Sequence, residues 1–510
     1  MLIRGKVLKG KYFDSVTLMR VGKALTALDG VADAAVVMGT AENREILAAA
    51  DLLLDDFATA GGADLLVALR CADAADGDAA LARLDELLVE MKPAAAGAAD
   101  FQPGSLEGAL RQLPGANLVL ISLAGRYAAA EARKALENGL HVMIFSDNVP
   151  LEEEVALKQL ADERGLLLMG PDCGTTIING APLGFANAVR RGKIGIVAAS
   201  GTGLQEVSSI IHNLGEGVSQ AIGTGGRDVK AVVGGRTFLA ALEALAADAH
   251  TEVILLISKP PDAAVLHKIR ERLRDIRKPV VTFFLGDDAP AANAPQTLEA
   301  AAYQAVARSR GKQGEDHTSV WSLRQKEYAN LAREATRRLA SGRRYLRGLY
   351  SGGTFCNEAQ ILFREQLKPL FSNLPGKGIG LLEDPLVSRG HSLIDFGEDA
   401  LTVGRPHPMI DFSLRRQRLL AEAQDPDVAV ILLDIVLGYG AHPDPAAELE
   451  DALRQAAMQA CIICSVTGTE QDPQSRGAVE KALRKAGAFV TPTHAAACQL
   501  AGMVLGQGAK

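Results

Sequence analysis

A repeated unit constrains the fold of this chain more than any other feature. In each unit a short apolar run ends in small or polar residues and is followed by a helical pattern, as at 117–138, 193–212 and 346–363. Apolar strands joined by amphipathic helices are typical of right-handed βαβ units, whose parallel sheets are buried on both faces. The sequence therefore predicts an α/β protein with more than one parallel sheet.

The length of 510 residues exceeds what a single hydrophobic core usually supports. Residues 92–105 are rich in Ala, Gly and Pro and are expected to form a linker. The first domain should open with a strand at 7–13, and the Ala- and charge-rich residues 291–340 should form a connecting arm. We expect four domains: a small α+β domain at 1–95, a Rossmann-like domain at 106–190, and two flavodoxin-like domains at 191–300 and 340–510.

Composition excludes several classes of partner. The net charge of −7 without a long basic run gives no electrostatic reason to expect nucleic acid or an anionic membrane. No apolar stretch reaches the ~18–20 residues that span a bilayer, and the first residues lack a signal-peptide pattern, so a cytoplasmic location is expected. Six cysteines in so long a chain predict no disulfide framework.

The cysteines and acidic residues also predict no metal site. Cys461 and Cys464 form a C-x-x-C inside an apolar run, which favours a structural role over redox chemistry. A second Cys/His pair that could complete a tetrahedral site is missing nearby, and the acidic pairs lack the spacing of metal ligands.

Ligands of open parallel sheets bind beyond the carboxyl ends of the strands. Several strand ends carry turns of Gly, Ser and Thr that open a helix, and such turns either cap the helix or bind a phosphate or carboxylate. Their recurrence favours anion binding. The expected binding residues are Ser200, Gly201, Thr202, Gly203, Gly223, Thr224, Gly225, Gly226, Ser351, Gly352, Gly353 and Thr354.

The same loops carry a family resemblance. GPDCGTTIING, GKIGIVAASGTGLQEV and AIGTGGRDV resemble successive loops of succinyl-CoA synthetase α subunits, and GLYSGGTFCNEAQ resembles the CoA-ligase domain of the β subunit. FdrA-type proteins, which fuse these parts behind a small N-terminal domain, share ISLAGRYAAAEA, SDNVP, SKPPD and GRPHPMID. Over nearly its whole length the chain resembles these FdrA-type relatives, and the resemblance makes the Rossmann-like domain a CoA-binding domain.

Two departures from the synthetases limit what the resemblance implies. The synthetases carry a phosphoryl group on a histidine in a G-H-A-G-A loop, but here Asp287 and Asp288 follow the corresponding strand. Lys259 stands near the position of the glutamate that holds this histidine in the family. No segment is left for an ATP-grasp module, so the chain by itself is not expected to use ATP as the synthetases do.

The resemblance implies an enzyme component that moves a small acyl or carbamoyl group to or from phosphate, as in an oxamate carbamoyltransferase-type complex of purine degradation. Phosphate would be the co-substrate, CoA a candidate cofactor, and partner subunits in an oligomer would complete the enzyme. The substrate would be a small acid, amide or acyl phosphate. One alternative is an ADP-forming acyl-CoA synthetase, an acid–thiol ligase with a separate ATP-grasp partner, and another is a non-enzymatic binding or regulatory protein.

The expected catalytic residues are Lys259, Thr175, Thr176, Arg405 and His407. Lys259 and the threonines would bind the phosphate. Arg405 could pair two oxygens of an anion through its planar fork. His407, in a loop shaped by two prolines, is open to two interpretations, as a structural contact or as a general acid/base near neutral pH.

Overall fold

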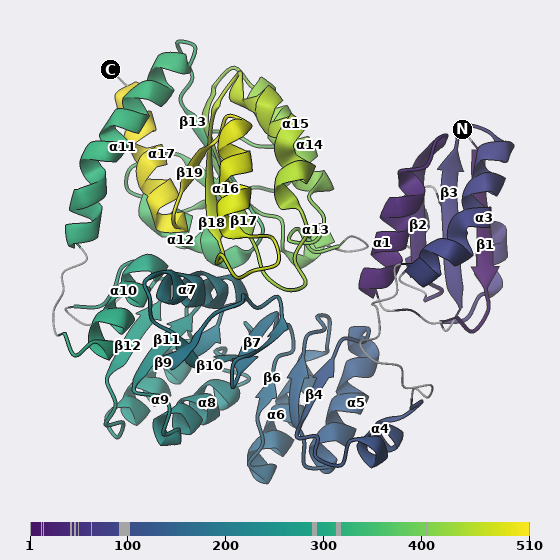
Figure 1. The fold of residues 1–510 in the computed structure, drawn as a ribbon, viewed down its shortest axis with the longest axis horizontal. Helices are drawn as coiled ribbons and strands as arrows, with labels where there is room; N and C mark the ends of the chain where they lie inside the picture. The colour runs from purple at the N-terminus through teal and green to yellow at the C-terminus, as the bar shows by residue number, and fades with distance from the viewer. Residues whose placement is uncertain are drawn as a thin grey trace. The chain divides into compact units, whose positions relative to one another are not determined.

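The structure is a computed structural model. It describes residues 2–11, 13, 15–40, 43–44, 47–48, 50, 52–62, 64–90, 103–287, 293–312, 318–402 and 406–508. The chain divides into two compact units (Figure 1). Unit 1 comprises Met1–Ala109 and Asp399–Pro406, and unit 2 comprises Leu110–Glu398 and His407–Lys510.

Unit 1 contains an antiparallel sheet in the order β1-β3-β2. One face packs through Val, Leu and Ala side chains against two helices. The expected first strand at 7–13 is wrong in position, because the strand ends at Leu8 and Gly10 turns the chain with a φ of 64°. The elements are β1 (Leu2–Leu8), α1 (Ser15–Thr26), β2 (Val31–Met38), η1 (Asp55–Thr59), β3 (Leu65–Cys71) and α3 (Ala74–Glu90).

Unit 2 begins with a small parallel sheet in the order β4-β5-β6. Buried alanines on α5 allow this helix to pack closely in the βαβ arrangement that the sequence predicts. The elements are β4 (Leu118–Ile121), α5 (Gly125–Glu137), β5 (His141–Ile144), α6 (Leu151–Arg164) and β6 (Leu168–Met169), and α4 (Leu106–Gln112) precedes them in the chain.

The second sheet of unit 2 has the order β12-β11-β9-β10-β7-β8. β9 (Arg191–Ala199), β10 (Val218–Gly223), β11 (Val253–Ser258) and β12 (Val280–Phe284) are parallel, whereas β7 (Thr175–Ile178) and β8 (Ala181–Gly184) form an antiparallel hairpin. Ile194 and Ile196 of β9 share a core with α7 (Gly201–Asn213) and α10 (Leu298–Ser309). Val197 of the same strand instead belongs to a second apolar core, with α8 (Arg236–Ala247) and α9 (Ala263–Leu273).

The expected connecting arm at 291–340 is therefore wrong where the structure describes it. Helix α10 covers one face of the second sheet, and its residues Leu298, Ala301 and Ala305 are buried. The Ala-rich pattern was that of a helix packed closely on a sheet. Tyr328 and Ala332 of the next helix are buried as well.

The third sheet is parallel throughout, in the order β15-β14-β16-β13-β17-β18-β19. One apolar core runs from α7 and α10 into this sheet through α12 and α17. The strands are β13 (Tyr345–Tyr350), β14 (Leu370–Ser372), β15 (Gly380–Leu381), β16 (His391–Asp395), β17 (Val428–Val436), β18 (Cys461–Thr467) and β19 (Phe489–Thr491). The helices are α11 (Thr318–Arg338), α12 (Gly353–Phe363), α14 (Ser413–Gln424), α15 (Pro445–Ala457), α16 (Arg476–Lys485) and α17 (His494–Gly508), and the short α13 (Asp399–Thr402) belongs to unit 1.

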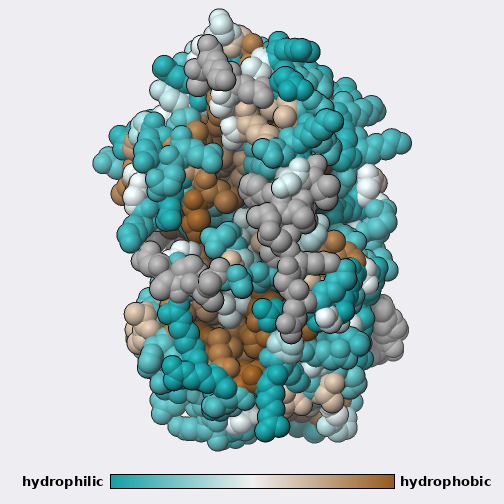
Figure 2. Space-filling model, turned by 90° about the vertical axis from the view of Figure 1, so that its left-hand side faces the viewer, coloured by the Kyte–Doolittle hydropathy of each residue, from teal (hydrophilic) through white to brown (hydrophobic). Residues whose placement is uncertain are grey.

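The predicted α/β class is confirmed: a Rossmann-like parallel sheet, two flavodoxin-like sheets and a small N-terminal α+β sheet. The four domain boundaries stay predictions. On the face of unit 2 in Figure 2, brown apolar side chains lie in recesses among teal polar ones. Among the described helices, none combines the length and apolarity needed to cross a membrane.

A buried ion cluster joins α6 to the turn after β10. The Lys158 ammonium lies 2.6 Å from Asp228 Oδ1 and 3.3 Å from Glu154 Oε1, and all three side chains are fully buried. Lys158 also donates to the Thr224 carbonyl over 3.0 Å. Asp228 in turn accepts the Phe238 N–H in the first turn of α8. The cluster therefore fixes the glycine-rich turn after β10 against the first sheet of unit 2.

Replacing Lys158 with Met should destabilise the protein by about 3–5 kcal/mol, because Asp228 would lose its buried cation and Glu154 would keep only its pair with Arg227, whose Nε lies 2.8 Å from Glu154 Oε2. Lys193→Met is the matched control. Lys193 pairs with Glu252 at the surface, so its loss should change the free energy of unfolding by about 1 kcal/mol or less. Urea unfolding followed by circular dichroism measures both, and equal shifts would contradict the role given to the cluster.

Candidate functional site

Two strands of unit 2 occupy the switch points of their sheets. β9 has β10 on one side and β11 on the other, and β13 lies between β16 and β17. Chain connections run in opposite directions from such a strand, which opens a crevice at its carboxyl end. Ser200 follows β9 and Ser351 follows β13. Helix α7 begins directly after Ser200, and α12 begins two residues after Ser351.

The first turns of α7 and α12 meet. Ser200 Oγ lies 2.6 Å from Thr354 Oγ1, which joins the two helix starts through their side chains. Ser200 also caps α7, since its Oγ accepts the Gly203 N–H over 3.1 Å. Thr202 lies so close to Gly352 that a β-carbon there would stand 2.8 Å from Thr202 Cγ2. Two helix N-termini thus lie side by side at the carboxyl ends of two sheets.

Lys259 and Asp395 lie beside this meeting point. Lys259 follows β11, and its ammonium is 3.5 Å from the point where a Gly353 β-carbon would stand. Asp395, the last residue of β16, places Oδ2 2.9 Å from the same point. Burial raises the pKa of Asp395 to about 6, against the lowering effect of Lys259 and of the Gly397 N–H. Asp395 was not among the expected site residues.

His407 lies at the edge of the same crevice. Its Nε2 is 3.2 Å from a β-carbon built on Gly397, and that point lies 3.2 Å from Asp395 Oδ1. Burial lowers the pKa of His407 to about 4, so the ring is neutral near pH 7. Nδ1 accepts the Met409 N–H, which assigns the ring proton to Nε2. His407 Nε2 can therefore act as a hydrogen-bond donor.

Several expected residues use their polar groups to hold the loops. Thr176 Oγ1 accepts the Gly223 N–H over 3.2 Å. Ser351 donates both its N–H and its hydroxyl to the buried Asp434 carboxylate. Gly225 has a φ of 80°, and a β-carbon there would stand 2.3 Å from the Pro171 carbonyl oxygen, so the close approach of two loops requires glycine. These contacts shape the crevice without facing it.

Other expected residues differ in what they offer. Thr175 is 2% exposed, and its hydroxyl lacks a hydrogen-bond partner within the described ranges. It lies 3.9 Å from a β-carbon built on Gly201, at the start of α7. Gly226 faces the Lys259 ammonium, which is 3.7 Å from its β-carbon position. Arg405 lies outside the residues that the structure describes, so its part stays a prediction.

The buried cysteines are not activated. Burial raises the pKa of Cys173 to about 11 and those of Cys461 and Cys464 to about 12. Their thiols are protonated near neutral pH and are poor nucleophiles. Both members of the C-x-x-C lie inside strand β18, as its apolar surroundings predicted.

A buried polar network holds α7 against α12 below their first turns. His494 Nδ1 lies 2.5 Å from Glu358 Oε2 of α12, and the His494 N–H donates to Glu206 of α7 over 3.0 Å. Thr467 donates to the other Glu206 oxygen over 2.5 Å. Burial raises the pKa of Glu206 to about 7. The network, with Phe355 stacked on the His494 ring at 4.7 Å, fixes the relative position of the two helices.

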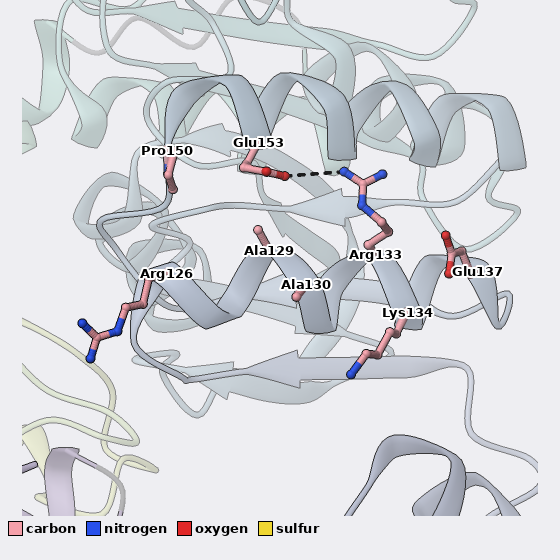
Figure 3. Close-up of a pocket in the computed structure, with 8 residues that line it drawn as sticks. All are labelled: Arg126, Ala129, Ala130, Arg133, Lys134, Glu137, Pro150 and Glu153. Carbon is pink, nitrogen blue, oxygen red and sulfur yellow. Dashed lines mark hydrogen bonds and ion pairs between the residues drawn. The ribbon is translucent and has the colours of Figure 1, made fainter. Parts of the chain in front are cut away.

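An open recess of about 480 Å³ lies elsewhere, on the outer surface of α5 and α6. Figure 3 shows Glu153 of α6 directed toward Arg133 of α5, and this ion pair spans 3.5 Å. Arg126 and Lys134 line the same recess. It contains none of the expected site residues, and its charged groups resemble an ordinary solvated helix surface.

Comparison with known proteins identifies two domains. Residues 349–504 match the family model described as CoA-ligase, and residues 1–103 match the model described as "AllF, heavy metal-associated domain". The second description implies a metal, but the residues do not fit one. Cys71 is the single cysteine of this segment, it is buried, and the segment has no histidine. Within the described ranges, no group of three or more His, Cys, Asp or Glu is arranged as a metal site.

About a third of the chain is similar to ligase α subunits. The succinate–CoA ligase [ADP-forming] subunit alpha-2 of Trichomonas vaginalis is 33% identical over 185 residues, which cover 34% of this chain and 58% of the relative. The malate–CoA ligase subunit alpha of Methylorubrum extorquens is 28% identical over 187 residues, covering 34% and 61%. The chain thus spans about 60% of the length of these relatives.

Two further matches extend over most of the chain. A solved structure, the dinucleotide-forming acetyl-coenzyme A synthetase 1 of Ca. Korarchaeum cryptofilum in complex with phosphate and ADP, has a TM-score of 0.29 and 15% identity, covering 77% of this chain and 82% of that one. The uncharacterized protein YahF of Escherichia coli (strain K12) is 42% identical over 492 residues, which cover 94% of both chains. The chain therefore belongs to the family of YahF.

Proposed function

We propose that this chain is the acyl- or carbamoyl-transferring component of an acyl-CoA synthetase-like enzyme, and that it binds phosphate or an acyl phosphate between α7 and α12. The observation that carries the proposal is the meeting of two helix N-termini beside the Lys259 ammonium. The match of residues 349–504 to the CoA-ligase model supports the class of chemistry.

The electrostatics of the crevice favour an anion. The N-terminus of a helix carries the equivalent of about half a positive charge, and its first N–H groups lack partners within the helix. Two such ends meet here, and Lys259 adds a full positive charge. Glycines at 201, 352 and 353 leave the backbone uncovered, so phosphate oxygens could approach the N–H groups directly.

Carbamoyl transfer is the finer form of the proposal. It follows from the resemblance to FdrA-type proteins, for which oxalurate and phosphate yield oxamate and carbamoyl phosphate. Such a reaction needs donors for the phosphate, an oxyanion-binding group for the carbonyl and alignment of both reactants, but no phosphohistidine. The neutral His407, whose ring proton is on Nε2 and whose Nε2 lies near Gly397, suits the oxyanion role. Partner subunits would supply the remaining groups.

The similarity to named succinate–CoA and malate–CoA ligase α subunits favours a second candidate, an ADP-forming ligase. In this case an ATP-grasp partner would have to be supplied in trans, and another group would have to carry the phosphoryl group. Assaying the purified complex for ATP-dependent consumption of CoA beside phosphorolysis of oxalurate separates the two candidates. Ligand binding without turnover in either assay would favour a regulatory protein.

Replacing Lys259 with Ala should weaken phosphate binding about 10- to 100-fold, because a charge-assisted hydrogen bond contributes about 1.5–3 kcal/mol. Isotope exchange between phosphate and carbamoyl phosphate should be lost with it. Lys230→Ala is the control, since Lys230 is exposed and pairs at 3.6 Å with Asp262. Unchanged exchange in a folded Lys259 variant would refute the role of this residue.

Replacing Gly353 with Ala should abolish phosphate binding at a modest cost in stability, because the buried Asp395 carboxylate must shift to admit the methyl group. The new methyl group would stand 2.9 Å from Asp395 Oδ2 and 3.5 Å from Lys259 Nζ, where the phosphate is expected. Alanine suits the first turn of a helix, so α12 should still form. Gly506→Ala, at a position with open space around it, is the control for calorimetric titration with phosphate. Wild-type affinity in the Gly353 variant would place the ligand elsewhere.

A further inference from the structure

Asp395 is a carboxylate in a crevice built for an anion. Its side chain is 3% exposed and stands at the carboxyl end of β16, next to the switch strand β13. Oδ1 accepts the Gly397 N–H over 2.9 Å. Oδ2 accepts no hydrogen bond from any residue in the described ranges, although it lies beside the first turn of α12. One oxygen is thus held in place and the other is left facing the crevice.

The cation nearby does not satisfy this second oxygen. Lys259 Nζ and Asp395 Oδ2 both lie within 3.5 Å of the same point above Gly353, yet no ion pair of 4 Å or less joins them in the described part of the chain. The buried Thr175 hydroxyl, also without a described partner, lies at the start of α7. The start of α12 thus lies beside a cation and a carboxylate oxygen, and the start of α7 lies beside a hydroxyl, for none of which the described residues supply a partner.

Several titratable or charged groups influence Asp395. Lys259 favours its ionised form, and two carboxylates disfavour it. His407 lies next to Gly397, and the charge of Asp395 acts to raise the pKa of Cys356 and that of Arg415. The titratable or charged groups near Asp395, taken over all the elements packed against it, are Lys259, Asp434, Glu398, His407, Cys356 and Arg415.

A phosphate dianion in this space would lie against Asp395 Oδ2, and two negative groups at such a distance repel strongly in a buried site. We propose that Asp395 is the catalytic acid–base of the site, taking up a proton when the anion binds and passing it to the leaving nitrogen. This inference rests on the proposed function and adds to it the residue that moves the proton.

The step balances in both directions. A hydrogen phosphate oxygen attacks the carbamoyl carbon of an N-carbamoyl amide, the C–N bond breaks with its electron pair going to nitrogen, and Asp395 gives its proton to that nitrogen. The proton that the hydrogen phosphate loses returns to Asp395. In reverse, the amide nitrogen attacks the carbamoyl carbon, the C–O bond breaks with its electron pair going to phosphate, and Asp395 gives its proton to the departing phosphate oxygen. The Asp395 carboxylate then takes the proton that the nitrogen loses. No oxidant, reductant or metal is needed.

Calorimetric titration of the full chain with sulfate tests the proton uptake. Sulfate resembles phosphate but stays a dianion at neutral pH, so any proton taken up belongs to the protein. Most Asp395 is ionised at neutral pH, because its pKa is about 6. Titrations in buffers of different ionisation enthalpy should give an uptake of about one proton per sulfate. Asp395→Asn should bind sulfate with no uptake, whereas His407→Asn should retain the uptake.

The outcomes separate the two proposals. If neither sulfate nor phosphate binds to the wild-type chain, the proposed function fails. If sulfate binds without uptake, or if the Asp395→Asn variant still takes up the proton, the role of Asp395 is overturned and the binding site stands. In the complete enzyme complex, Asp395→Asn should lower phosphorolysis of oxalurate about 100-fold or more and remove the pH dependence that Asp395 causes. A variant with full activity would also overturn the inference.

Discussion

The contact between Ser200 and Thr354 is the interaction on which the site depends, because it brings two helix N-termini together. The partial positive charges at these ends repel each other, so their proximity is costly unless negative charge lies between them. Asp395 supplies some of it in the free protein, and a bound anion would supply more. The fold thus maintains an arrangement whose electrostatic cost a ligand would relieve, which is the physical basis of a preorganised anion site.

Such an arrangement needs rigid support, and the buried network beneath it provides that support. Glu206 lies in the second turn of α7 and Glu358 in the second turn of α12, and both contact His494 at the start of α17. Burial lowers the pKa of His494, but the Cys498 thiol and the Glu358 carboxylate act against this and carry it well above its ordinary value. The His494 imidazole pairs with Glu358 and the His494 backbone N–H donates to Glu206, so this one residue ties three helices together below the crevice. The network also leaves the helix starts free of these carboxylates.

Sequence reasoning predicted the sheets well where apolar runs were long, as in β9, β11 and β17. It missed β14 and β15, because strands of two or three residues carry no periodic signal. The hairpin β7–β8 had a signal that went unused: Asn179-Gly180 adopts φ values of 51° and 85°, as the Asn-Gly pair of a tight hairpin requires. The Ala-rich sequence of α10 is compatible with an exposed arm or with a buried core helix, and only its tertiary packing shows that it is a core helix.

Local patterns in the sequence could indicate single turns of the candidate site, but not which turns lie together. Glycine-rich turns identified both helix starts, but no pattern in one sequence shows that Ser200 and Thr354, 154 residues apart, lie in contact. The Gly, Ser and Thr turns do not include Asp395, although an acidic residue at the end of an apolar strand is itself a signal at a sheet's carboxyl edge. Thr176 and Ser351 lie in loops at strand ends, and only the structure shows that their hydroxyls hold these loops.

Charge balance connects the lysine and the aspartate to one type of reaction. Lys259 and an ionised Asp395 cancel, which leaves the two helix ends as the net positive field of the empty crevice. A dianion and an ionised aspartate would together exceed that field, so the combination is stable only with a proton on the carboxyl group. A residue that carries a phosphoryl group must act as a nucleophile, so a proton on Asp395 would not assist that reaction. An acyl or carbamoyl transfer that expels a nitrogen does need it, and this requirement would explain a carboxylate in the proposed anion site.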